Sequence, residues 1–213
     1  HGEDCVAVID VALRKVVKTV VVGRAPHMVL AAPNGATIYA NCEGDNRLVA
    51  FDAATWEKTA EIPLWGVPRP FAFSPDGSKI FQTIRWLNGL LVIDTAKNQV
   101  VDQIALSGTS FSPEGREAHG CAITPDSTQL WLTTQNLDTL TILDARSFGV
   151  LGQISVGREA NWVRFTPNGE RAVVSLTNDD QVKIIGVAER KVIASVKVGS
   201  QPKRLAVGWV AVR

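Results

Sequence analysis

Apolar and polar residues alternate along short segments of this chain, and the same series of segments returns at a regular interval. One unit contains "RPFAFS" (69–74), "KIFQTI" (79–84), "GLLVID" (89–94) and "QVVDQIAL" (99–106). Alternation with a period of two residues is typical of β-strands that bury one face. Helical periodicity is not seen in any segment, so the pattern predicts four antiparallel strands in each unit.

The turn between the first two strands of this unit is Ser74-Pro75-Asp76-Gly77. Proline fixes φ, aspartate bonds the local backbone and glycine accepts a positive φ, which together favour a tight turn. The prolines of four such turns are spaced by 42, 50 and 42 residues: Pro33, Pro75, Pro125 and Pro167. An apolar residue followed by aspartate recurs with spacings of 42, 42 and 50, at Asp10, Asp52, Asp94 and Asp144.

Two independent markers that share one period indicate a repeat protein, and four strands in each repeat predict the blades of an all-β β-propeller. We expect one propeller domain or fragment over residues 1–213. Its complete blades are expected at 26–66, 68–108, 118–157 and 160–199, with partial blades at 1–23 and 202–213.

The two partial blades lack one inner strand between them. A missing strand leaves buried ladder groups unpaired, at a cost of roughly 1–3 kcal/mol each. A larger ring is therefore expected in preference to a closed ring of five blades. In the five-blade alternative, "GWVAVR" (208–213) would supply the missing strand.

Four segments resemble the YVTN family of β-propeller repeats: "VGRAPHMV" (22–29), "IYAN" (38–41), "SPDG" (74–77) and "VIDTAKNQVVDQI" (92–104). The resemblance implies a ring of about seven blades in a periplasmic, secreted or cell-surface protein of a bacterium or archaeon. Propellers related to this family include those of haem-binding nitrite reductases, copper-containing nitrous-oxide reductase and lactonases. Because these activities differ, the resemblance implies a fold and a location but no particular reaction.

Composition narrows the choice of partners. The 213 residues include 22 basic and 21 acidic side chains, a net charge of +1, which argues against a nucleic-acid-binding surface. We expect no transmembrane segment, because no apolar run approaches the roughly 20 residues that span a bilayer.

Three cysteines, Cys5, Cys42 and Cys121, are too few for a disulfide framework. The chain begins at His1 and its single methionine is Met28, as expected for a processed export signal or for a fragment.

The connections between strands differ at the two faces of the expected ring. One face carries the uniform turns, whereas the other carries varied segments such as "CEGDN" (42–46) and "IRWLN" (84–88). An eight-residue insertion within "SGTSFSPEGREA" (107–118) also falls on the varied face. Loops on a rigid scaffold often carry function, so this segment is either a lid or docking loop or a plain surface excursion. The candidate loop contacts are Arg85, Trp86, Glu114 and Arg116.

Each innermost strand is expected to begin with a polar residue although the strand itself is apolar. These positions recur with the repeat, at His27, Arg69, His119, Asn161 and Lys203. In a propeller they meet at one mouth of the central channel, where clustered positive charge attracts anions. Arg69 offers a bidentate fork for a carboxylate or phosphate. The alternative is a wet channel mouth whose polar residues need no ligand.

Two hypotheses for function follow. The first is an exported binding module that docks a protein partner or a small anionic ligand at this mouth, with no catalytic residues and no cofactor. The alternative is a redox or hydrolytic propeller, related to haem, copper or lactone enzymes, with the His/Arg ring at its cofactor or substrate. A metal site at His27 and His119 is the weaker option, because Arg69 intervenes and a cation beside arginine is electrostatically unfavourable.

Overall fold

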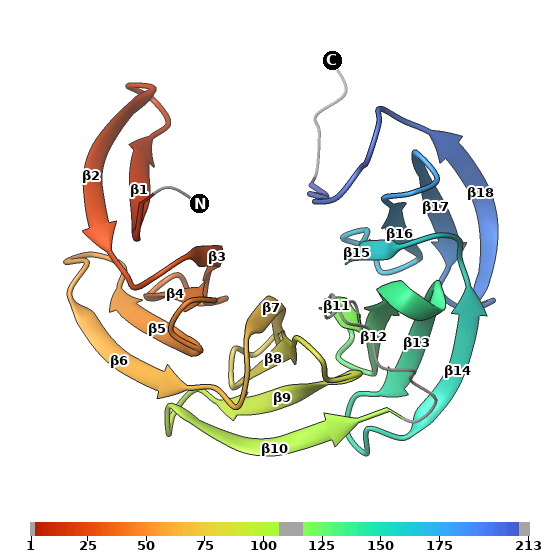
Figure 1. Cartoon of the computed structure of the whole chain (residues 1–213), viewed down its shortest axis with the longest axis horizontal. Coiled ribbons are helices and arrows are strands. Elements are labelled where there is room, and N and C mark those ends of the chain that lie inside the picture. The colour runs from red at the N-terminus through yellow and green to blue at the C-terminus, as the bar shows by residue number, and fades with distance from the viewer. Residues whose placement is uncertain (1–2, 107–116, 209–213) are drawn as a thin grey trace.

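A computed structural model describes residues 3–106 and 117–208 (Figure 1). These residues form β-strands and a single 3-10 turn at Gln135–Leu137, and within them no helix is long and apolar enough to cross a membrane. The strands are β1 (Cys5–Asp10), β2 (Lys15–Val21), β3 (Pro26–Ala31), β4 (Thr37–Cys42), β5 (Arg47–Asp52), β6 (Lys58–Pro63), β7 (Pro68–Phe73), β8 (Lys79–Ile84), β9 (Gly89–Asp94), β10 (Gln99–Ala105), β11 (Ala118–Ile123), β12 (Gln129–Thr134), β13 (Thr139–Asp144), β14 (Val150–Ser155), β15 (Ala160–Phe165), β16 (Arg171–Leu176), β17 (Gln181–Gly186) and β18 (Lys191–Lys197).

The strands form four antiparallel sheets of four strands and one sheet of two, each in chain order: β1-β2, β3 to β6, β7 to β10, β11 to β14 and β15 to β18. The sheets stand around a common axis, with β3, β7, β11 and β15 innermost (Figure 1). This arrangement confirms the predicted β-propeller blades. The arc they form is not closed.

The turns that repeat in the sequence fix the register of the first two strands in each blade. Ser74 Oγ donates to Asp76 Oδ1 (2.5 Å) and accepts from the backbone N–H of Lys79 (2.9 Å). Gly77 has φ of 72°, a left-handed conformation that suits glycine. Thr124 and Thr166 make the equivalent bonds in two further blades, so a hydroxyl residue before the proline forms a similar local turn in each of these three blades.

The hydrophobic core is divided between neighbouring blades. Four clusters of buried side chains lie at the four junctions between successive sheets, and each combines residues from both sheets. Trp131, Phe71 and Phe81 are among the largest fully buried side chains. Each blade is therefore stabilised by its neighbours, as expected for a repeat architecture.

The two ends of the chain differ from each other. β1 and β2 form an antiparallel pair whose positions in the repeat correspond to β5 and β6, the third and fourth strands of the next blade, whereas residues 202–208 form no strand. The expectation that Lys203 begins an innermost strand is therefore wrong. Among the described residues there is no second strand of that blade to pair with it, and an isolated strand has no partner for its ladder groups. In the five-blade alternative, residues 208–213 supply the missing strand and close the ring. Apart from Gly208, this segment lies outside the described residues.

Candidate functional site

A β-bulge lies at the polar position of each innermost strand. In β3, Pro26 pairs with Cys42 and Met28 pairs with Asn41, which leaves His27 without a cross-strand partner. The registers of β7, β11 and β15 shift at the equivalent position, so that two residues face one residue of the next strand. A bulge interrupts the ladder and redirects a side chain. It is the local reason why a polar side chain at the start of an apolar strand can face the channel.

A polar side chain of each second strand links the bulge to the next blade. It lies within hydrogen-bonding distance of the backbone carbonyl oxygen of the next polar ring residue. The pairs are Asn41 with Arg69 (2.7 Å), Thr83 with His119 (2.7 Å), Thr133 with Asn161 (3.0 Å) and Ser175 with Lys203 (2.5 Å). The backbone carbonyls of four ring residues, Arg69, His119, Asn161 and Lys203, are thus each held by the preceding blade.

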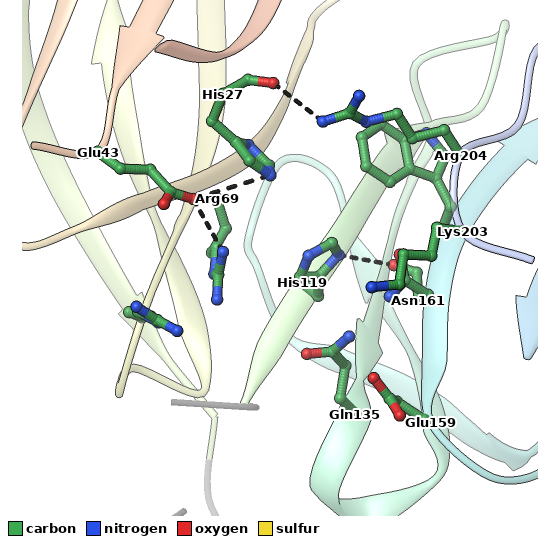
Figure 2. Close-up of a pocket in the computed structure, with 11 residues that line it drawn as sticks. His27, Glu43, Arg69, His119, Gln135, Glu159, Asn161, Lys203 and Arg204 are labelled. Carbon is green, nitrogen blue, oxygen red and sulfur yellow. Dashed lines mark hydrogen bonds and ion pairs between the residues drawn. The ribbon is translucent and has the colours of Figure 1, made fainter. Parts of the chain in front are cut away.

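These ring residues line a cavity of about 650 Å³ at one mouth of the channel (Figure 2). Glu43, Arg85 and Gln135, which follow the second strands β4, β8 and β12, also line it. The described residues that line it are His27, Glu43, Arg69, Arg85, His119, Gln135, Glu159, Asn161, Trp162, Lys203 and Arg204. The varied connections and the starts of the inner strands therefore lie at the same mouth.

A carboxylate already occupies part of this cationic wall. Glu43 Oε1 accepts from Arg69 Nη1 at 2.8 Å and lies 3.8 Å from His27 Nε2 (Figure 2). The Arg69 side chain is only 15 % exposed, so the pair is largely shielded from water. Glu43 holds Arg69 in place and offsets part of the positive charge on this side of the mouth.

Both histidines are neutral near pH 7. Burial and, to a lesser degree, the positive charge of Arg69 together lower the pKa of His119 to about 3. Burial likewise lowers the pKa of His27, although Glu43 opposes this effect. His119 Nδ1 lies 2.9 Å from the carbonyl oxygen of Asn161, so in the neutral ring Nδ1 donates and Nε2 is left as an acceptor. The positive charge of the mouth therefore comes from arginine and lysine.

The cavity combines surplus positive charge with unsatisfied polar atoms. Among the described residues, four arginine and lysine side chains and two carboxylates line it, a surplus of two positive charges when both histidines are neutral. Some of its buried polar atoms have no hydrogen-bond partner within the described residues: His27 Nδ1, Arg69 Nε, Asn161 Oδ1 and Trp162 Nε1. Buried polar atoms normally have partners, so a ligand or water is expected to complete these bonds.

The structure brings together all five ring residues named from the repeat, and adds Arg85 from the candidate loop contacts. Trp86 lies outside the cavity. The residue is 49 % exposed, and the Arg85 guanidinium lies 5.2 Å from its ring centroid. Glu114, Arg116 and most of the insertion lie outside the described residues. A ligand-binding role for the ring stays a prediction.

The weaker metal alternative gains no third ligand from the part of the chain that the structure describes. The rings of His27 and His119 are 6.3 Å apart between centroids and meet edge to face. No group of three or more His, Cys, Asp or Glu side chains in the described residues is placed to hold a metal ion.

Sequence reasoning missed several residues of the site. Glu43 was visible only as part of a varied segment, and its pairing with Arg69 joins two different blades. The polar side chains that contact the backbone carbonyls of the ring residues could have been found from the sequence, because they recur within apolar strands with the spacing of the repeat, 42, 50 and 42 residues. They are Asn41, Thr83, Thr133 and Ser175.

Comparisons with known proteins support the fold alone. No protein-family model matches the sequence, and no curated protein matches it. A solved structure of hydrazine synthase from Kuenenia stuttgartiensis is similar, with a TM-score of 0.73 and 18% identity over 84% of this chain. A functionally unknown protein from Desulfotomaculum acetoxidans DSM 771 gives a TM-score of 0.79 and 14% identity over 93% of this chain. The chain covers 51% and 64% of those two chains, respectively.

Proposed function

We propose that this chain is part of an exported β-propeller that binds a small oxyanion, a carboxylate or a phosphate, at the cavity around His119. The resemblance to YVTN repeats supports the location and a larger ring. The observation that carries the proposal is a surplus of two positive charges in one cavity, counted over the described residues, beside buried polar atoms that have no partner among those residues. Charge in a concave, partly desolvated site concentrates anions more effectively than charge on an open surface.

Cationic side chains stand on both sides of His119 (Figure 2). Arg69 comes from β7, and its buried Nε has no acceptor within the described residues. Lys203 and Arg204 come from the segment after β18, and Arg204 Nη2 donates to the carbonyl oxygen of His27 at 3.3 Å. An anion over the imidazole of His119 would receive hydrogen bonds from both sides and charge from the arginine and lysine groups.

Isothermal titration calorimetry tests this proposal with inorganic phosphate, acetate and neutral acetamide as ligands. We expect saturable binding of phosphate or acetate and none of acetamide. Lys203→Met should weaken anion binding at least five-fold, because it removes one of the positive charges that line the cavity. The Lys203 side chain is exposed, so we expect the variant to keep the fold. Lys97→Met, which removes an exposed lysine at a remote turn, should leave it unchanged. Equal affinity in parent and Lys203→Met would overturn the assignment, as would failure of both anions to bind.

The other hypotheses remain predictions. Docking of a protein partner at the same mouth would involve the 107–118 insertion. A stoichiometric haem or copper, found by metal analysis and absorption spectroscopy of the full-length protein, would support the redox or hydrolytic alternative.

A further inference from the structure

The opposite mouth of the channel has a different character. A second cavity, of about 300 Å³, lies at the other ends of the same four inner strands. Most of its walls are aromatic, aliphatic or proline side chains, and a single charged residue, Arg164, lines it among the described residues. The lining residues in the described part of the chain are Leu30, Phe71, Ala72, Phe73, Ala122, Ile123, Pro125, Arg164, Phe165, Thr166 and Pro167.

Arg164 departs from the repeat. The equivalent positions of the other three inner strands hold Leu30, Ala72 and Ala122, each paired with the equivalent residue of its second strand. Arg164 has the same register opposite Val173 in β15. The blade therefore does not require a cation here, because three of four copies use an apolar side chain at this position.

The guanidinium of Arg164 is held from one side. Its Nη1 donates to the carbonyl oxygens of Cys121 (3.3 Å) and Val163 (3.0 Å), and it stacks 5.3 Å from the ring centroid of Trp162. Nε and Nη2 make no hydrogen bond to any described residue. These two atoms form one edge of the guanidinium, the edge that binds a carboxylate through two parallel hydrogen bonds.

The charge of Arg164 is not compensated by the described part of the protein. Burial lowers the pKa of Arg164, and no carboxylate among the described residues counters this shift. Arginine nevertheless stays charged in proteins. Buried or half-buried charges are normally paired, so Arg164 is a fixed, partly desolvated cation that lines a mainly apolar cavity.

We propose that this second mouth binds a monocarboxylate with a short apolar tail, its carboxylate on the Nε/Nη2 edge of Arg164 and its tail against Phe73, Ile123 and Phe165. A volume of about 300 Å³ equals roughly ten water volumes of ~30 Å³ each, enough for a tail of several carbons. The carboxylate supplies the charge that Arg164 lacks, and the tail removes apolar surface from water. This site is separate from the His119 cavity and does not depend on the function proposed for it.

The test uses octanoate and its neutral analogue 1-octanol, titrated into the ¹⁵N-labelled chain and followed by amide chemical shifts. We expect octanoate to shift the amides of Ile123 and Phe165 saturably, with little change at His27 and His119. Octanol should bind at least ten-fold more weakly, because it cannot form the paired hydrogen bonds to arginine.

Variants separate a binding role from a structural one. Arg164→Leu restores the residue type found at Leu30 and should bind octanoate and octanol equally. Arg164→Lys keeps the charge but loses the fork, so its preference for octanoate should be reduced and not abolished. Arg171→Leu, an exposed arginine outside this cavity, is the matched control and should behave as the parent.

Three results would overturn the proposal: equal binding of octanoate and octanol by the parent, octanoate shifts confined to the His119 mouth, or a preference for octanoate that survives in Arg164→Leu. The comparison of the two ligands on the parent protein needs no variant, so the proposal can be refuted even if the Arg164 variants do not fold.

Discussion

Replacing Glu43 with glutamine should strengthen anion binding and weaken the fold at the same time. Glu43 Oε1 lies 2.8 Å from Arg69 Nη1, so it competes with any anion for that guanidinium. Glutamine keeps the shape of the side chain and removes the negative charge. The two effects have opposite signs because the carboxylate stabilises Arg69 in the empty site and repels the ligand in the occupied one.

The magnitudes follow from the geometry. An anion bound to the other edge of Arg69 would lie roughly 5–6 Å from Glu43, where two unit charges at an effective dielectric constant of 20 repel by about 3 kcal/mol. The side chains of Arg69 and Glu43 are 15 % and 19 % exposed, so water and salt reduce this repulsion to about 1–2 kcal/mol, or roughly ten-fold in Kd. Loss of the partly buried ion pair should lower the free energy of unfolding by about 1–2 kcal/mol.

Calorimetric titration with phosphate measures the change in anion affinity. Urea unfolding, with and without phosphate, measures the change in the free energy of unfolding. Glu61→Gln is the control, because Glu61 also pairs with an arginine, Arg47 (2.6 Å), but on the outer strands of a blade. It should leave anion affinity unchanged. Weaker phosphate binding by Glu43→Gln would refute the reasoning, since it would mean that Glu43 positions Arg69 for the ligand instead of competing with it.

Three further predictions concern stability and are measured by urea unfolding. Gly77→Val should cost about 1–2 kcal/mol because φ is 72° there, whereas Ser127→Gly at the equivalent turn, where φ is 61°, should be neutral or stabilising. Thr133→Val should cost about 1–3 kcal/mol, because the buried hydroxyl accepts from Gly120 N–H (2.8 Å) and lies 3.0 Å from the carbonyl oxygen of Asn161; a near-neutral effect would show that this link between blades is dispensable. Stability should fall as pH drops below about 6.5, the unfolded pKa of histidine, towards the folded pKa of His119 of about 3, because the unfolded chain binds more protons in that window. The fall should be smaller in His119→Gln, and identical pH profiles would contradict it.

Much of the fold could be predicted from the sequence because its causes are local. The turn at Ser74–Gly77 is made by bonds among neighbouring residues, and alternation along strands such as β8 depends only on which face is buried. Repetition then shows that the same unit recurs, and a chain of four-stranded units has few ways to bury both faces of each sheet. The convergence of His27, Arg69, His119 and Asn161 follows from the same periodicity.

The sequence alone determined which residues occupy equivalent places, and thus that polar side chains gather at one mouth. Only the tertiary structure decided their charge state and their partners. Glu43 reaches Arg69 across a blade junction, burial keeps His119 neutral, and Arg164 lines a mainly apolar cavity. Desolvation and long-range pairing depend on distances between residues far apart in the chain, and the repeat spacing fixes position within a blade but not those distances.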